Sequence, residues 1–315
     1  MINQVAIQTA LWRWLGKFKP GASTEGDLDA STRAYLTQEN PRLLDLRRRY
    51  QAASRPEHSC WASWETKVNL LRFRGEDDYV SQAYLRRTQE RYEFSTAYVE
   101  ATDTHGRLRS FTEDNRFGVK LWPVLEGVNV SRDLLDSIIE LGFLEESLGF
   151  RTDQAVRALD IGAGYGRFAH RFTQGFPNGR IHCTDAIATS SFVCEFYTKY
   201  RGCDRATVVP FDELGSLKAG QFDWAQNIHS WSECTVGWVR FWLDRLVDLN
   251  VPYLFIVPHF AGFTTRENDG SVGDYGPELE RHGYKLLVKR RKFGRSQIAD
   301  RHGIYPADYY IFKRG

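Results

Sequence analysis

A short glycine-rich loop is the part of the sequence best suited to hold a ligand. Residues 159–167 read Leu-Asp-Ile-Gly-Ala-Gly-Tyr-Gly-Arg, directly after an apolar run and directly before a segment with helical spacing. Glycine has no Cβ, so the backbone can turn sharply and come close to a ligand. In an open α/β sheet, the loop after the first strand lies where ligands bind. The loop therefore predicts a cofactor site, although a tight turn without a ligand has the same composition.

The spacing of the glycines distinguishes between nucleotide cofactors. The dinucleotide fingerprint G-x-G-x-x-G would place its third glycine at position 167, which is Arg167. Asp160 precedes the first glycine by two residues; an acid there disfavours a pyrophosphate but suits the ammonium and methionyl part of S-adenosylmethionine. Asp185 follows Gly162 by 23 residues, where a carboxylate can accept two hydrogen bonds from ribose hydroxyls; the alternative is that Asp185 only caps a helix. The pattern favours S-adenosylmethionine as cofactor and S-adenosylhomocysteine as product.

Further cofactor contacts are expected after the third and fourth strands. Asp212 is placed to reach the adenine amino group, and Phe211 to stack nearby. The predicted cofactor-binding set is Asp160, Gly162, Ala163, Gly164, Tyr165, Gly166, Arg167, Asp185, Ala186, Phe211, Asp212 and Asn227.

Two histidines stand where a catalytic base would be needed. His229 follows the fourth expected strand and His259 the fifth, and ligands on such sheets bind beyond the carboxyl ends of the strands. Histidine suits this work because its unperturbed pKa is about 6.5. Glu233 lies four residues beyond His229, so in a helical segment it would face the same way and orient the imidazole. Ordinary hydrogen-bonded loop histidines are the alternative, and His170 is expected at the surface.

These residues depend on a sheet whose strands alternate with helices. The pattern predicts an α/β fold with a doubly wound, mostly parallel seven-stranded sheet, whose last two strands form an antiparallel pair at its edge. We expect a mainly helical N-terminal region over 1–150, for acceptor binding, a lid or oligomerisation, and a cofactor-binding domain over 151–315. The expected strands are 156–161, 180–185, 206–210, 222–228, 253–257, 284–289 and 309–313, and the expected helices include 41–50, 78–98, 131–142, 167–174, 188–200 and 235–249.

Composition restricts the expected cellular location and the classes of binding partner. Lys and Arg total 42 against 40 Asp and Glu, a net charge of +2 that argues against a general nucleic-acid binder. The apolar run near 251–257 is far short of the ~20 residues that span a bilayer, so no membrane association is expected. Five cysteines without a C-x-x-C pair indicate reduced thiols and a cytoplasmic protein. The amphipathic segments fit a homodimer, and equally a monomer with its first helix packed on its own core.

At this point the sequence resembles class I S-adenosylmethionine-dependent methyltransferases over about 156–313. The form of the glycine loop, together with Asn-Ile-His-Ser-Trp-Ser-Glu at 227–233, also resembles the sugar O-methyltransferases of bacterial natural-product and glycan tailoring. The stretches 131–137 and 73–79 extend that likeness into the N-terminal region. The resemblance implies methyl transfer to a hydroxyl of a sugar or glycosylated natural product, with His229 or His259 as general base. It also implies the acceptor-binding residues Tyr79, Arg132 and Asp133. Trp231 is a further acceptor-binding candidate that could stack on a sugar ring, although a buried Trp is the more common case.

A divalent cation is an open question in such a site. Some sugar O-methyltransferases use one to bind and acidify vicinal hydroxyls. Glu233, Asp269 and Asp274 carry suitable oxygen ligands, but their spacing is not diagnostic. A solvated loop is the favoured interpretation of 266–274.

Other functions fit parts of the same pattern. The acceptor could be a phenol or another non-sugar hydroxyl, since no residue separates these classes. Methylation of base or amide nitrogen is disfavoured because the [DN]-P-P-[YF] signature is absent, 227–230 reading Asn-Ile-His-Ser. Asp160 and Arg167 count against a dehydrogenase. A cofactor-binding protein without catalysis, which uses its helical N-terminal region to hold a partner, is the alternative from another class.

Overall fold

The chain folds into two compact units, and each draws on separated stretches of sequence. The computed structural model describes residues 28–53, 65–75, 79, 88–125, 128–259, 262–294 and 308–315. The described part of the first unit lies within 1–37, 69–146 and 292–306, and that of the second within 38–68, 147–291 and 307–315. The functions predicted for the two halves of the chain stay predictions.

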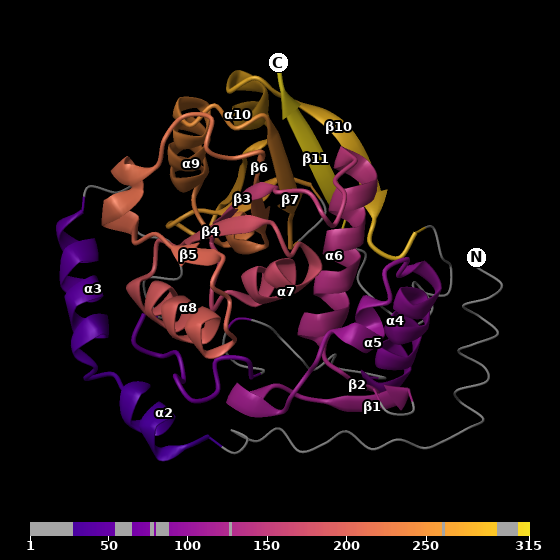
Figure 1. Ribbon diagram of the computed structural model, residues 1–315. Coiled ribbons are helices and arrows are strands. Elements are labelled where there is room, and N and C mark those ends of the chain that lie inside the picture. Colours follow the sequence, from indigo (N-terminus) through magenta and orange to yellow (C-terminus); the bar gives the residue numbers. More distant parts are fainter. Residues whose placement is uncertain are drawn as a thin grey trace. The chain divides into compact units, whose positions relative to one another are not determined.

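The second unit is built on one seven-stranded sheet (Figure 1). Its strand order is β10-β11-β7-β6-β3-β4-β5. The five strands from β5 to β7 are parallel, β11 is antiparallel to β7, and β10 is antiparallel to β11. The predicted α/β fold and its antiparallel pair are therefore confirmed. The strands are β3 (Arg157–Ile161), β4 (Arg180–Thr184), β5 (Ala206–Val208), β6 (Trp224–Ile228), β7 (Tyr253–Val257), β10 (Tyr284–Arg291) and β11 (Asp308–Arg314).

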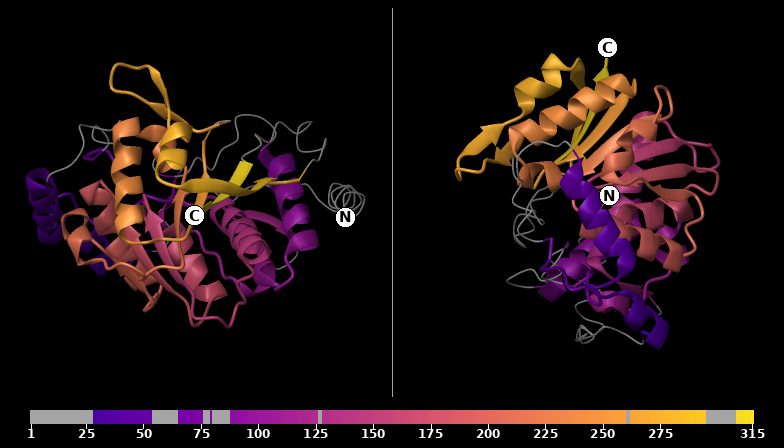
Figure 2. Two further views of the ribbon diagram at one scale, coloured as in Figure 1. Left: turned by 90° about the horizontal axis from the view of Figure 1, so that it is seen from above. Right: turned by 90° about the vertical axis from the view of Figure 1, so that its left-hand side faces the viewer.

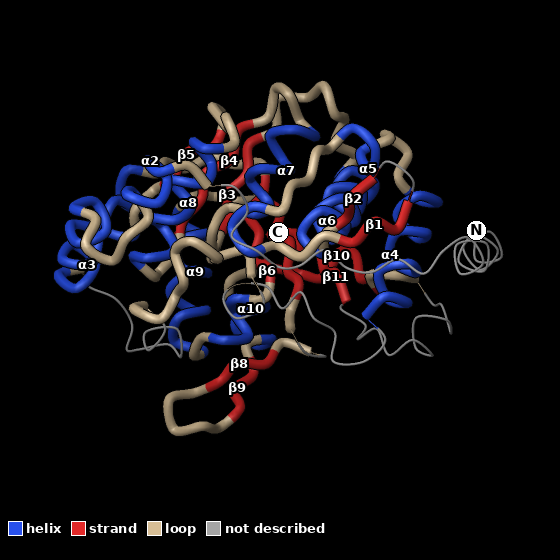
Figure 3. The backbone as a smooth tube through the Cα atoms, turned by 90° about the horizontal axis from the view of Figure 1, so that it is seen from below, coloured by secondary structure: helices blue, strands red, loops and turns tan. Residues whose placement is uncertain are grey.

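Helices cover both faces of this sheet. The strand order reverses at β3, which pairs with β4 on one side and β6 on the other. Because crossovers between parallel strands are right-handed, the helices on either side of this point fall on opposite faces. Helices α7 and α8 follow β3 and β4, whereas α9 and α10 follow β6 and β7; Figure 3 shows the helices in blue around the red strands. The helices are α3 (Pro41–Ala52), α7 (Arg167–Gly175), α8 (Ala188–Tyr200), α9 (Val236–Asp248) and α10 (Gly276–Arg281), with 3₁₀ turns η3 (Phe211–Ser216) and η4 (Ser230–Glu233).

The core of the second unit lies between the central strands and their covering helices. Ala158, Leu159 and Ile161 of β3 are buried, as are Trp224 of β6 and Leu254 of β7. Strands covered on both faces need such apolar runs. The edge strand β10 differs, since most of its residues are half-buried or exposed.

The first unit is mainly helical in its described part. Its longest helix begins where the sequence predicts, because the Ser131 hydroxyl accepts the backbone N–H of Leu134 at 3.1 Å as an N-cap. A two-stranded antiparallel ribbon precedes this helix. The predicted helix over 78–98 is described only from Thr88. The elements are α2 (Ala30–Tyr35), α4 (Thr88–Thr102), α5 (Arg107–Ser110), η2 (Arg116–Gly118), β1 (Trp122–Leu125), β2 (Val128–Val130) and α6 (Arg132–Leu148), whose last turn passes into the second unit.

One local prediction was incomplete and another was wrong. The segment predicted as a solvated loop is exposed over 268–272, but it closes a β-hairpin of β8 (Thr264–Arg266) and β9 (Val272–Asp274), which projects away from the sheet (Figure 2). His170 is 5% exposed rather than at the surface. It is buried because α7 packs against α8, where the Tyr197 ring meets its imidazole edge-on at 5.6 Å.

None of the helices in the described ranges is both long enough and apolar enough to cross a membrane.

Candidate functional site

The glycine loop adopts the conformation that its composition predicts. Gly162, Gly164 and Gly166 all have positive φ, at +72°, +56° and +86°, a region that side chains with a Cβ rarely enter. The carbonyl oxygen of Thr184, at the end of β4, accepts the backbone N–H groups of Gly162 and Ala163 at 2.9 and 3.2 Å. The loop is thus a fixed turn between β3 and α7, held by the neighbouring strand.

Close packing explains why two of these positions are glycine. A Cβ on Gly162 would lie 2.1 Å from the hydroxyl oxygen of Ser230, and one on Gly166 would lie 2.9 Å from the sulfur of Cys194. The absence of a side chain at Gly162 therefore leaves room for the turn after β6, and its absence at Gly166 leaves room for helix α8. Residues 162–164 are half-buried, whereas Tyr165 and Gly166 are buried. The apex of the loop is the part that a ligand can approach.

Asp185 connects the second strand to this loop. One carboxylate oxygen accepts the N–H of Gly164 at 3.0 Å, and the other accepts that of Ile187 at 2.9 Å. The side chain belongs to a residue only 9% exposed, and burial raises the pKa of Asp185 to about 7, with Glu65 and Asp160 adding repulsion. An ionised carboxylate has about four acceptor sites, so two remain for the hydroxyls of a ribose.

The residues beside Asp185 include a group that sequence reasoning missed. Glu65 accepts the N–H of Thr189 at 3.0 Å and the guanidinium Nε of Arg47 at 3.2 Å. Helix α8 has no side-chain cap from the residue that precedes it, so Glu65 caps it from 124 positions away. No local pattern marks such a contact.

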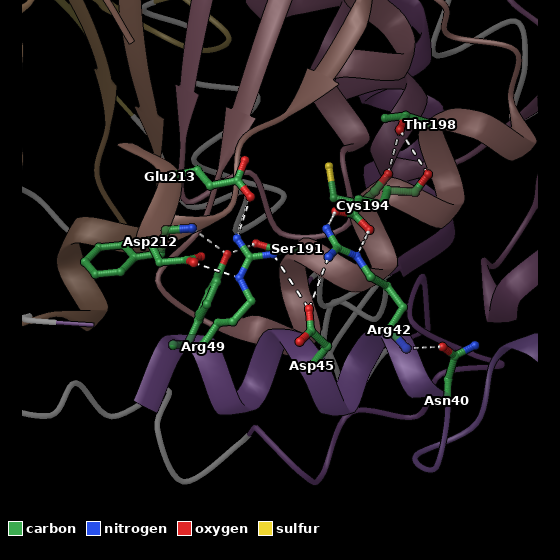
Figure 4. Close-up of polar contacts among 12 residues, drawn as sticks. Asn40, Arg42, Asp45, Arg49, Ser191, Cys194, Thr198, Asp212 and Glu213 are labelled. Atoms are coloured by element: carbon green, nitrogen blue, oxygen red, sulfur yellow. Dashed lines mark hydrogen bonds and ion pairs between the residues drawn. The ribbon is translucent and has the colours of Figure 1, made fainter. Parts of the chain in front are cut away.

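Helix α3 engages the residues predicted to hold adenine (Figure 4). Asp212 accepts the Nε of Arg49 at 2.7 Å, and the N–H of Phe211 donates to the Tyr50 hydroxyl at 2.7 Å. The Tyr50 hydroxyl also shares a hydrogen bond of 2.7 Å with Ser191 of α8. Phe211 is buried in a group of aromatic rings that includes Tyr50 and Trp238. Both residues follow β5 as predicted, and their side chains are held by protein groups.

Two other predicted cofactor residues contact the loop from inside. Asp160 is buried in β3 and accepts the side-chain amide of Gln226 at 3.0 Å. Asn227 donates to the Ile161 carbonyl at 2.8 Å and accepts the N–H of Trp231 at 2.9 Å. Asn227 therefore holds the end of β3 and the turn after β6 together. Ala186, two residues after β4, and Arg167, the first residue of α7, are half-buried.

The two predicted histidines meet at the carboxyl ends of β6 and β7. These strands are parallel neighbours, as expected, and the N–H of His229 donates to the Val257 carbonyl at 2.7 Å. The imidazole centroids of His229 and His259 are 4.3 Å apart. The ring of His259 shares a 2.7 Å hydrogen bond between its Nε2 and the Oε1 of Glu233. The structure therefore brings all three predicted catalytic side chains into one cluster.

The acid in this cluster contacts a different histidine from the one that sequence spacing indicates. Glu233 was expected to share a helical face with His229. His229 instead has φ +72° and ψ −38°, and the turn after it is a short 3₁₀ helix, so the four-residue helical spacing does not apply. A positive φ in a non-glycine residue is uncommon, and such strain of about 1–3 kcal/mol is typical of functional sites.

Trp231 is buried, so its ring is not exposed as a stacking surface for a sugar. It is 1% exposed and packs edge-on against the Tyr275 ring at 5.9 Å. Neither the indole Nε1 of Trp231 nor the hydroxyl of Tyr275 has a hydrogen-bond partner within the described structure.

The predicted acceptor residues of the N-terminal region belong to the first unit. Asp133 is buried, with Oδ2 3.2 Å from Nε of the fully buried Arg74. Arg74 also contacts Glu113 at 2.8 Å. Arg132 reaches Asp136 at 3.3 Å, and Tyr79 is half-buried. The pairing of Asp133 with Arg74 contributes to the core of this unit, and an acceptor role for these residues stays a prediction.

No group of three or more His, Cys, Asp or Glu side chains gathers as a metal site within the described ranges. Glu233, Asp269 and Asp274 accordingly do not form one.

Comparison with known proteins finds structural similarity at low sequence identity. No protein-family model and no curated protein matches the chain. Solved structures do match over part of it. The [4+2]-cyclase SpnF is 16% identical, with a TM-score of 0.44 over 58% of this chain and 82% of that one. A protein from Galdieria sulphuraria described as a "putative sarcosine dimethylglycine methyltransferase" is 12% identical, with a TM-score of 0.44 over 59% of this chain and 89% of that one. The magnesium protoporphyrin IX methyltransferase from Synechocystis is 10% identical, with a TM-score of 0.41 over 70% and 97%. Such distant likenesses assign no activity to this chain.

Proposed function

We propose that this chain is an S-adenosylmethionine-dependent O-methyltransferase that acts on a hydroxyl of a sugar or glycoside. One observation carries the proposal: the glycine loop with Asp185, and the cluster of His229, His259 and Glu233, lie at the same edge of one sheet. Parallel strands end at a common edge, and β3, β4, β6 and β7 are consecutive neighbours across it. A cofactor site and a candidate base therefore share one edge of one unit.

The charges around the loop support this cofactor over a dinucleotide. Asp160 and Asp185 are both buried beside the glycines. The acid Asp160, two residues before the first glycine, disfavours a pyrophosphate, whereas S-adenosylmethionine carries a cationic ammonium and sulfonium. Asp185 does not separate the two cofactors, because dinucleotide-binding domains also place an acid on the ribose hydroxyls. Asp185 is fixed by two backbone N–H groups and keeps acceptor sites for the ribose hydroxyls. When bound, the cofactor supplies an activated methyl group.

The histidine cluster supplies the proton acceptor. Transfer forms a bond between the acceptor oxygen and the methyl carbon and breaks the carbon–sulfur bond, and the hydroxyl proton passes to a base. Glu233 accepts the Nε2–H of His259, so Nδ1 carries the lone pair in the neutral ring. The His229 ring lies with its centroid 4.3 Å from that of His259, tilted by 37°, and His229 is the alternative base. Glu233 then stabilises the imidazolium that forms.

The polar character of the strand ends supports a hydroxyl-rich acceptor. The side chains of His259 and Glu233 are 36% and 27% exposed, so both can meet an incoming molecule. The neighbouring aromatic rings of Trp231 and Tyr275 are buried. A carboxylate and an imidazole hydrogen-bond to sugar hydroxyls, which present several donors in a small volume.

A methyl-transfer screen tests the proposal. The full chain is incubated with S-adenosylmethionine and either glycosides or matched phenols, with and without Mg²⁺, and both methylated product and S-adenosylhomocysteine are measured by mass spectrometry. We expect turnover with a glycoside that falls at least 100-fold in the His259→Gln variant. Turnover with phenols alone would overturn the sugar assignment. Cofactor binding without any transfer would identify a non-catalytic binding protein.

A further inference from the structure

We propose that the β8–β9 hairpin fixes the backbone that follows Glu233 and so holds the Glu233–His259 pair in contact, with Glu267 as the positioning residue. We call the contacts of Glu267 and Arg266 with this segment the brace. The inference rests on the proposed function, because it concerns the same catalytic cluster. The hairpin, which Figure 3 labels as β8 and β9, follows His259 in the chain, and β8 returns to contact the turn that carries Glu233. Its role is therefore to fix an acid that the chain otherwise leaves partly exposed.

The side chain of Glu267 reaches the segment directly after that turn. Its Oε1 accepts the backbone N–H of Val236 at 2.9 Å and the hydroxyl of Thr265 at 2.7 Å. Val236 is the first residue of α9, a helix of 13 residues, where backbone N–H groups lack partners within the helix and a negative charge is favourable. Glu267 thus fixes the start of α9, three residues after Glu233.

A backbone hydrogen bond from the hairpin also holds the segment between Glu233 and α9. The N–H of Arg266 donates to the Cys234 carbonyl at 3.1 Å. Cys234 directly follows Glu233, so the hairpin holds the first and third residues after the acid, Cys234 and Val236. The turn is also tied to His259, because Ser232 accepts the His259 backbone N–H through its hydroxyl at 3.1 Å. Together these contacts fix the positions from which Glu233 and His259 meet.

Strand β9 of the hairpin has a glycine, Gly273, where it passes the Glu267 carboxylate. A Cβ on Gly273 would lie 2.4 Å from the Thr265 hydroxyl, 2.5 Å from the Glu267 carboxylate and 2.7 Å from a Val236 methyl. Real Cβ atoms do not approach neighbours so closely, so only glycine allows β9 to pass here. Three separate elements therefore converge on the Glu267 carboxylate.

The brace matters because Glu233 is 27% exposed. A partly exposed side chain samples several rotamers, and ordering it carries an entropic penalty. A fixed backbone keeps the rotamer that reaches His259 within hydrogen-bond distance. Loss of the brace is expected to spread Glu233 over several positions. The Nε2–H tautomer of His259 would then lose its partner.

Ring-nitrogen NMR of His259 tests the brace without relying on turnover. Two-bond proton–nitrogen spectra distinguish the Nε2–H and Nδ1–H tautomers of a neutral imidazole. We compare the full chain with Glu233→Gln, Glu267→Ala, Glu267→Gln and Asp269→Ala. Asp269 is the matched control, because it is an acid at the tip of the same hairpin that accepts only from Ser271 in the described contacts.

We expect Glu267→Ala to shift the tautomer populations of His259 as Glu233→Gln does, by at least twofold. Glu267→Gln should retain the wild-type spectrum, because its amide oxygen can still accept from Val236. Asp269→Ala should also be unchanged. Unchanged His259 tautomers in Glu267→Ala would overturn the proposal. Should that variant fail to fold, Thr265→Val removes one donor alone and must give a smaller shift in the same direction.

A second readout separates this proposal from the proposed function. Glu267→Ala should bind S-adenosylhomocysteine with unchanged affinity while its kcat falls about tenfold. Absence of cofactor binding in the wild type would overturn the proposed function, yet the tautomer shift would still report the brace.

Discussion

The carboxylate of Asp185 accepts the backbone N–H of Gly164 at 3.0 Å, so the acid after β4 holds the loop after β3. The two strands are parallel neighbours in register, with Ile161 opposite Thr184. A carboxylate and a glycine turn that are separate in the sequence therefore become one structure. That structure is what the proposed cofactor would bind.

Asp185 makes the stability of the protein depend on pH. Its pKa is raised from 3.8 to about 7, so the native state binds the proton more tightly than the unfolded chain does. The resulting stabilisation is complete below pH ~4 and is lost as pH rises through about 7. Between pH 6 and 8, we expect the wild type to lose about 1 kcal/mol of unfolding free energy relative to Asp185→Asn. Urea unfolding at the two pH values measures this, and parallel losses in both proteins would contradict it.

Substitution of Gly162 should damage the cofactor loop. A Cβ there lies 2.1 Å from the Ser230 hydroxyl at a backbone φ of +72°, so Gly162→Ala combines a clash with strain. We expect a destabilisation of about 1–3 kcal/mol and at least tenfold weaker binding of S-adenosylhomocysteine. Gly215→Ala is the control, because no atom lies within 4 Å of its Cβ position. Equal effects of the two substitutions, measured by calorimetry and urea unfolding, would contradict the account.

Most elements of the second unit were predictable from local sequence. The predicted helix over 188–200 and strand over 253–257 match α8 and β7 to the residue. The spacing of apolar residues indicates such elements, because the residues that face the core are apolar and recur with the period of the helix or strand. The neighbouring positions of His229 and His259 were predictable from strand order alone.

Contacts between distant segments were not predictable in the same way. Arg49 and Tyr50 contact Asp212 and Phe211 across more than 160 positions, and sequence periodicity carries no information on which surface a helix meets. The hairpin was missed because each of its strands has only three residues, too few to show alternation. The pairing of Glu233 with His259 depends on the non-helical backbone of His229.

The histidine cluster should affect chemistry without affecting cofactor affinity. His259→Gln and Glu233→Gln remove the members of a hydrogen bond of 2.7 Å. General-base catalysis contributes roughly 10²–10⁴-fold, so we expect kcat to fall within that range for His259→Gln and by less for Glu233→Gln. The dissociation constant of S-adenosylhomocysteine should stay within twofold. Parallel losses of kcat and of cofactor affinity would assign the cluster a structural role instead.

Two buried tyrosines give opposite predictions for stability. The Tyr284 hydroxyl donates to the Val251 carbonyl at 2.9 Å, whereas the Tyr275 hydroxyl has no hydrogen-bond partner within the described structure. Tyr284→Phe should therefore lower the free energy of unfolding by about 1–3 kcal/mol, because it leaves a buried carbonyl unsatisfied. Tyr275→Phe should be neutral or stabilising. Denaturant titrations compare the variants directly, and an equal loss in both would show that Tyr275 is satisfied by a bound water.

Calorimetric titration with S-adenosylhomocysteine measures directly whether the glycine loop binds this cofactor. We expect saturable one-site binding to the wild type, greatly weakened binding to Gly162→Ala, and no binding of NADH. A thermal shift should accompany it, because ligand at 100 times its dissociation constant stabilises by ~2.7 kcal/mol. Binding of NADH, or no binding of S-adenosylhomocysteine at millimolar concentration, would contradict the assignment of the glycine loop.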